Sequence, residues 1–114
     1  MKHSEKIRKK RYTILIGLSD KDTQEQRVET ERLLRLVHNC CKSYGLAFSS
    51  ILQDGGCVLD DGRYVLEKSV CLVFIDPDET ALGELGRDLC AFLHQESVLV
   101  TVDEVECYSI AESL

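Results

Sequence analysis

The chain has 114 residues, of which 44% are hydrophobic and 30% are charged, and its net charge is −6. A chain of this length can bury the core of one domain without metals or disulfides. Its longest apolar runs, such as Val70–Ile75, are too short to span a membrane. The acidic balance argues against direct binding of nucleic acid, because like charges repel.

The charge is divided unevenly along the chain. Residues 1–11 contain six basic residues and one acid, whereas residues 12–114 contain eight basic and nineteen acidic residues. We expect a flexible basic tail over 1–11, one folded domain over 12–110 and a C-terminal tail over 111–114. The basic tail either contacts RNA, DNA or an acidic surface, or is a solvated segment.

The start of the chain and its cysteines indicate a cytoplasmic protein. No apolar stretch typical of a signal peptide follows Met1. Most cysteines fall at apolar positions of predicted helices or strands, where a free thiol acts as a small hydrophobic group. We therefore expect all six to be reduced: Cys40, Cys41, Cys57, Cys71, Cys90 and Cys107.

The first half of the chain predicts a strand followed by a helix. Tyr12–Leu18 is rich in β-branched residues and apolar on both faces, as in a central strand. Thr23 and Gln26 have the spacing of a capping box, which predicts a helix start at Thr23. The helix should run to about Tyr44, because Gly45 is a natural stop.

The next segment predicts a hairpin. The second strand should start near Ala47, with a bulge at Gly55–Gly56. Asp61–Gly62 predicts a two-residue turn, which would pair Leu59 with Tyr64. The third strand then continues to Ile75.

A second helix and a fourth strand complete the chain. Asp76–Pro77–Asp78 should end the third strand, because proline cannot donate to a sheet. Leucines at helical spacing predict a helix over Glu79–His94. Alternating apolar residues predict a strand over Ser97–Val102 that can extend to Tyr108.

This order predicts an α+β, ferredoxin-like β-α-β-β-α-β sandwich with a four-stranded antiparallel sheet and two helices on one face. The first and third strands should be central. The uncovered sheet face would carry Leu15 and Leu99, which is too apolar to remain bare. We therefore expect a homodimer through this face.

No catalytic residues, cofactor or metal site can be assigned from the sequence. Asp20 and Asp22 follow the first strand, and Asp76 and Asp78 follow the third. We expect the ends of these strands to meet at one edge of the sheet. Either the four carboxylates hold a hard cation there, or they complement the helix dipoles, which is the interpretation we favour.

Two segments carry a resemblance to known proteins. Tyr12–Thr23 resembles the opening of small proteins of phages and conjugative elements of Gram-positive bacteria. Glu67–Ser69 with Gln95–Val100 resembles a bacterial family of unknown function with a ferredoxin-like sheet. The resemblance implies an accessory protein of a mobile element. It also directs attention to four polar residues that form either a small polar pocket or hydrogen bonds between elements: Glu67, Ser69, Gln95 and Ser97.

Three functions are compatible with these features. The first is a non-enzymatic protein that binds a basic, nucleic-acid-binding host protein, as an anti-CRISPR protein would. Its acids Asp103, Glu104 and Glu106 would contact the partner, or would only protect an edge strand from aggregation. The alternatives are a small ligand-binding or enzymatic domain of the dimeric α+β-barrel type, and a structural protein of a mobile element.

Overall fold

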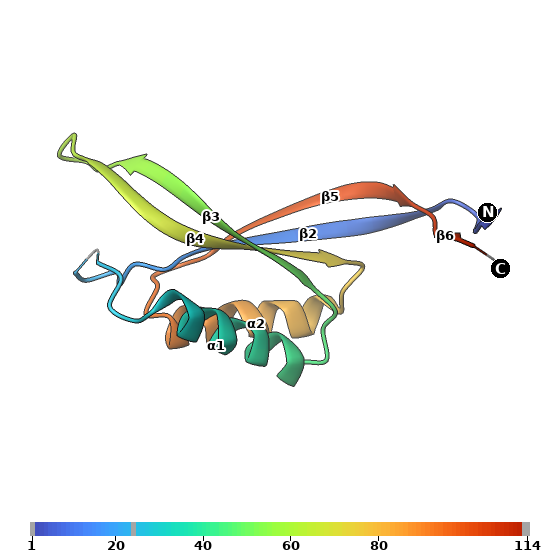
Figure 1. Ribbon diagram of the computed structural model, residues 1–114, viewed down its shortest axis with the longest axis horizontal. Helices are drawn as coiled ribbons and strands as arrows, with labels where there is room; N and C mark the ends of the chain where they lie inside the picture. Colours follow the sequence, from blue (N-terminus) through green and yellow to red (C-terminus); the bar gives the residue numbers. More distant parts are fainter. Residues whose placement is uncertain (1, 24, 113–114) are drawn as a thin grey trace.

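In the computed structural model, which describes residues 2–23 and 25–112, two helices cover one face of a four-stranded antiparallel sheet (Figure 1). The sheet order is β3–β4–β2–β5, so the expectation that the two most apolar strands are central is confirmed. A short pair of strands, β1 and β6, lies near the termini. The fold is the predicted ferredoxin-like sandwich, and its elements are β1 (Lys2–His3), β2 (Ile7–Gly17), α1 (Thr30–Ser43), β3 (Ser49–Val58), β4 (Tyr64–Ile75), α2 (Glu79–Phe92), β5 (Leu99–Cys107) and β6 (Ile110–Ala111).

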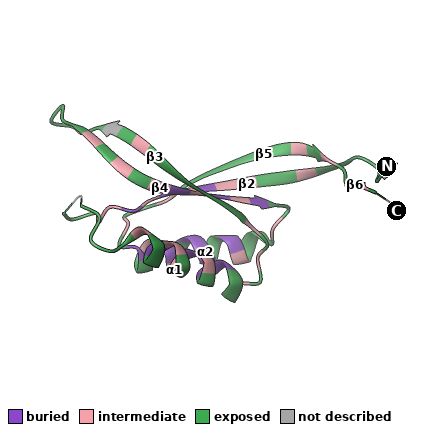
Figure 2. Cartoon of the chain, viewed as in Figure 1, coloured by how far each residue is buried: buried purple, intermediate pink, exposed green. Residues whose placement is uncertain are grey.

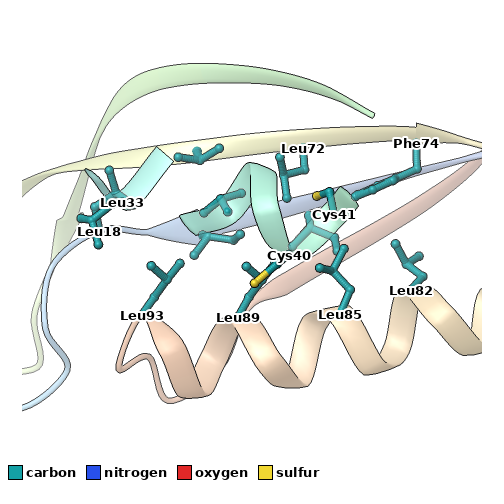
Figure 3. Close-up of a cluster of buried hydrophobic side chains, with 14 residues drawn as sticks. Leu18, Leu33, Cys40, Cys41, Leu72, Phe74, Leu82, Leu85, Leu89 and Leu93 are labelled. Atoms are coloured by element: carbon teal, nitrogen blue, oxygen red, sulfur yellow. The ribbon is translucent and has the colours of Figure 1, made fainter. Parts of the chain in front are cut away.

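The hydrophobic core lies between the helices and the sheet face that they cover, which we call the covered face (Figures 2 and 3). Successive strand residues point to opposite faces, so alternate residues of β2 and β4 enter this core. Both helices contribute a stripe at three- and four-residue spacing. The fully buried side chains are Phe74, Ile14, Ile16, Leu72, Leu85, Leu89, Val37, Val70 and Cys41.

Both helices end as expected, but the first begins seven residues later than Thr23. The Asp20 side chain accepts hydrogen bonds from the amides of Asp22 and Thr23, and Thr23 Oγ1 accepts one from Glu25 N. These short polar side chains stabilise turns in place of the helix. α1 stops before Gly45, whose φ is +66°, and Asp78 caps α2 by accepting from Ala81 N at 3.0 Å.

The hairpin forms at the expected place with a different register. Leu59 N donates to Arg63 O, and Gly62 N donates to Leu59 O, so the loop has three residues rather than two. Gly62 has a φ of +86°, as in a type I turn followed by a left-handed residue. Val58 therefore pairs with Tyr64, which makes the predicted partner Leu59 wrong by one position.

The predicted bulge at Gly55–Gly56 is also wrong. Gly55 pairs with Glu67 and Gly56 with Leu66 in an unbroken ladder. A Cβ on Gly56 would collide with the side chain of Tyr64, so this glycine makes room for the tyrosine.

The basic N-terminal segment is part of the sheet from Ile7 onward, so the expected start of the first strand at Tyr12 is wrong. Arg8 pairs with Glu104 at 3.3 Å, and Arg11 with Asp103 at 2.6 Å, across β2 and β5. These cross-strand pairs extend both strands beyond the helices. The expected C-terminal tail begins within β6, and Ser113 and Leu114 lie outside the described residues.

The cysteines whose side chains the structure describes are free thiols: Cys40, Cys41, Cys71, Cys90 and Cys107. The side chain of Cys57 lies outside that description. Within the described residues, no helix is both long and apolar enough to cross a membrane.

Candidate ligand-binding site

The sheet face that no helix covers, which we call the open face, has an apolar row beside a polar one. Cross-strand pairing aligns four residues into the apolar row: Ile51, Cys71, Leu15 and Leu99. The next row along the strands contains Gln53, Ser69 and Gly17, and Glu67 lies one step further on β4. Leu99 is 60% exposed and Ile51 56%, so the apolar row is largely uncovered in the single chain.

Glu67 is the acidic group next to this polar row, and its half-buried side chain lies against Gly17 of the neighbouring strand. A Cβ on Gly17 would lie 2.7 Å from Glu67 Oε1, closer than real Cβ contacts. Ser19 N donates to Glu67 Oε2 at 3.3 Å. A glycine at position 17 is therefore what allows the carboxylate to lie across the strand.

Two hollows share Glu67 and Val65 in their walls. One, of about 210 Å³, is lined by Leu15, Ile16, Gly17, Gln53, Gly55, Gly56, Val65, Glu67 and Ser69. The other, of about 170 Å³, is lined by Ser19, Asp20, Lys21, Leu59, Val65, Glu67 and Gln95. The first hollow places a carboxylate beside apolar side chains and glycines, which is the usual composition of a small-ligand site, whereas the second is lined mostly by polar residues.

A larger hollow of about 500 Å³ lies between the helices. It is lined by Arg32, Arg35, Leu36, Asn39, Cys40, Ser43 and Phe92. Its two arginines are exposed. We favour the hollows at Glu67 because a half-buried carboxylate and a backbone donor converge there.

Three of the four polar residues singled out from the sequence gather around these hollows. Glu67 lines both, Ser69 lines the first and Gln95 lines the second. The Gln95 side-chain amide donates to Ser19 O. Ser97 is exposed and does not line either hollow.

A group of metal-ligand type lies beside the second hollow. Asp20, Asp22 and His94 have ligand atoms within 4.8 Å of one another, and these residues could hold a cation. His94 Nδ1 lies 2.5 Å from Asp20 Oδ2, and Nε2 lies 3.6 Å from Asp22 Oδ2. The hydrogen bond from His94, with those from the Asp22 and Thr23 amides, lowers the pKa of Asp20 to about 2.

Asp76 and Asp78 do not join this group, so the expectation that the ends of these two strands meet at one edge of the sheet is wrong. β2 and β4 are antiparallel, and their carboxyl ends lie at opposite ends of the sheet. Asp76 N donates to Lys10 O near the start of β2. Asp78 caps α2, as the helix-dipole interpretation expects.

The three acids proposed to bind a partner lie on β5, far along the sheet from Glu67. Asp103 and Glu104 already pair with Arg11 and Arg8, and Glu106 is exposed. Their binding to a basic protein stays a prediction.

Sequence reasoning missed Gly17 and the contact of His94 with Asp20. Gly17 ends an apolar strand and gives no signal of its own until the Glu67 side chain is placed against it. His94 follows the end of α2, at a position where glycine is common. A histidine at such a position is a sequence feature that could have directed attention to its side chain.

Comparison with solved structures relates the chain to three kinds of protein, although no protein-family profile and no curated protein matches its sequence. A phage SAM lyase in complex with S-methyl-5'-thioadenosine is 23% identical with a TM-score of 0.64, over 93% of this chain and 92% of the lyase. CutA from Synechococcus elongatus PCC7942 is 17% identical with a TM-score of 0.60, over 93% and 86% of the two chains. CPII, a nitrogen regulatory PII-like protein from Thiomonas intermedia K12 bound to ADP, AMP and bicarbonate, is 13% identical with a TM-score of 0.52, over 91% and 99%. At this level of identity the likeness establishes the shared fold.

Proposed function

We propose that this chain is a small enzyme that binds S-adenosylmethionine (SAM) on the open face around Glu67 and cleaves it to S-methyl-5'-thioadenosine. The observation that carries the proposal is the half-buried Glu67 carboxylate, held over Gly17 between two hollows. The likeness to phage SAM lyase over nearly the whole length of both chains supports it. The activity corresponds to the enzymatic alternative of the sequence analysis.

The charges of the ligand suit this surface. SAM carries an ammonium, a sulfonium and a carboxylate at neutral pH, so it is a net cation approaching a chain of net charge −6. We assign Glu67 to the ammonium group, whose charge persists through the reaction. The hydroxyl of Ser69 and the amide of Gln53 are the neighbouring polar groups.

The reaction requires no water and no external base. The SAM carboxylate oxygen forms a bond to Cγ while the Cγ–sulfur bond breaks, and the electron pair of that bond stays on sulfur. The products are the neutral thioether S-methyl-5'-thioadenosine and the five-membered lactone of homoserine, with the ammonium unchanged. Because a negative and a positive charge both disappear, a dry apolar surface accelerates the step.

The apolar row would provide such a surface if a second copy of the chain covered it. Its side chains lie next to the polar row, and in one chain Ile51 and Leu99 are more than half exposed while Leu15 and Cys71 are partly exposed. Self-association through the open face, predicted from Leu15 and Leu99, is therefore part of the proposal.

Incubation with SAM and chromatography of the products tests the proposal. The wild type should release S-methyl-5'-thioadenosine, and Glu67→Gln, which keeps the shape and removes the charge, should be at least about tenfold slower. Glu31→Gln, which neutralises an exposed acid in the first turn of α1, is the matched control and should keep the wild-type rate. Unchanged SAM after incubation with the wild type would contradict the proposed activity.

A further inference from the structure

We propose that His94 and Gln95 are positioning residues, which fix the Glu67 carboxylate by holding the Ser19–Asp22 loop against the end of α2. This inference deepens the proposed function and rests on it. Its evidence is a continuous set of hydrogen bonds from the helix end, through the loop, to Glu67.

The first part of this connection is the end of α2. His94 has a φ of +52°, in the left-handed region where glycine is the usual residue. Gln95 N donates to Cys90 O at 2.9 Å, which closes the helix end. Histidine is less favoured than glycine in this conformation, and its ring provides a contact with Asp20 that glycine could not make.

The histidine holds the loop from two sides. Lys21 N donates to His94 O at 3.1 Å, and the His94 ring lies 2.5 Å from Asp20 Oδ2. The Asp20 side chain is only 13% exposed and also accepts from the Asp22 and Thr23 amides. The loop is thus fastened to the helix end through its backbone and through a shielded carboxylate.

The next residue carries the connection to the candidate site. The Gln95 side chain donates to Ser19 O, and the amide of that same Ser19 donates to Glu67 Oε2 at 3.3 Å. Gln95 therefore holds the backbone of Ser19, the residue whose amide orients Glu67. Without the fastening, Ser19 would move away and Glu67 would turn toward solvent.

Two variants test this connection, one for each of its halves. His94→Gly keeps a residue suited to positive φ and removes the ring, whereas Gln95→Ala removes the amide. In each, we expect the Ser19 amide to exchange with solvent about tenfold faster than in the wild type. We also expect the dissociation constant of S-adenosylhomocysteine, a SAM analogue without the sulfonium, to rise about tenfold. His38→Ala, which removes the histidine on α1 that contacts Ser50, is the control and should change neither quantity.

A double-mutant cycle separates positioning from general destabilisation. If His94 acts through Glu67, His94→Gly should no longer weaken S-adenosylhomocysteine binding in a Glu67→Gln background. Equal weakening in both backgrounds, or unchanged Ser19 exchange in both single variants, would overturn the inference. Ser19 exchange is measured without ligand, so a wild type that binds no S-adenosylhomocysteine would instead contradict the proposed function.

Discussion

The two faces of β4 show how one strand serves two purposes. Val70, Leu72 and Phe74 point toward the helices and are fully buried, whereas Ser69 and Cys71 point away and stay partly exposed. The buried residues of the covered face are all apolar, and they come from β2, β4 and the two helices with the residues that directly follow β2 and α2. The open face combines apolar residues with a polar row and a carboxylate. The comparison indicates that the covered face supplies stability and leaves the open face free to bind.

The strongest test of this division compares a leucine from each face. Leu85→Ala in the core should lower the free energy of unfolding by about 2–5 kcal/mol, because it removes contacts and leaves a cavity. Leu99→Ala on the open face should cost less than about 1 kcal/mol in the single chain. Urea denaturation at low protein concentration measures both, and equal losses would show that the two faces do not differ in this way.

The open face should instead control association. Leu99→Asp places a charge in the apolar row, and we expect it to yield a folded monomer while the wild type is a homodimer. Light scattering at high micromolar concentration gives the mass, and circular dichroism checks folding. A monomeric wild type would remove self-association from the account and leave the apolar row to a foreign partner.

The reactivity of two cysteine thiols, one on each face, provides a chemical comparison of the faces. Burial raises the pKa of the Cys41 thiol to about 11, whereas Cys71 lies on the open face and is partly exposed. At pH 7 the shift from 9.0 to about 11 lowers the thiolate fraction of Cys41 about a hundredfold. Iodoacetamide labelling of the folded Leu99→Asp monomer, in which no second copy covers the apolar row, should therefore modify Cys71 long before Cys41. Labelling at equal rates would mean that the covered face opens readily.

The tip of the β3–β4 hairpin belongs to neither face, and a substitution there gives a reference value for the loss of stability. Gly62→Val should destabilise by about 1 kcal/mol or more, because valine is strained at a φ of +86°. Gly83→Ala, on an exposed turn of α2 with open space around it, should not destabilise. Thermal unfolding of the two variants separates the effect of backbone conformation from the loss of any glycine.

The smallest effect on stability should come from the acids of β5. Neutralising Asp103, Glu104 and Glu106 together should leave the Tm nearly unchanged, because exposed ion pairs contribute little. If these acids bind a basic protein, the triple variant should associate with it more slowly, and the difference should shrink as salt rises. Unchanged association together with aggregation would identify the acids as protection for an edge strand.

The fold could be predicted from the sequence because its signals are local. Residues 70–75 form an uninterrupted apolar run, which marks a central strand, and the leucines of α2 recur at helical spacing. Thr23 misled because its hydroxyl stabilises a turn as readily as it caps a helix. Asp61–Gly62 marked the hairpin without deciding between a two- and a three-residue loop.

The candidate site was less accessible to sequence reasoning because it depends on register. Glu67 and Gln95 could be singled out as polar residues near strands. Their meeting with Gly17 and Ser19 requires the pairing of β2 with β4 and the path of the loop after β2. A one-residue error, like that made at the hairpin, moves a side chain to the other face of the sheet.

Mapping S-adenosylhomocysteine binding by the chemical shifts of backbone amides tests the central claim most directly. We expect saturable shifts at Gly17, Ser19, Glu67 and Ser69, which line the two hollows, and loss of these shifts in Glu67→Gln. Shifts confined to the groove between the helices at Arg35 and Phe92, or no shifts at millimolar ligand, would contradict the assignment of the open face as the binding site.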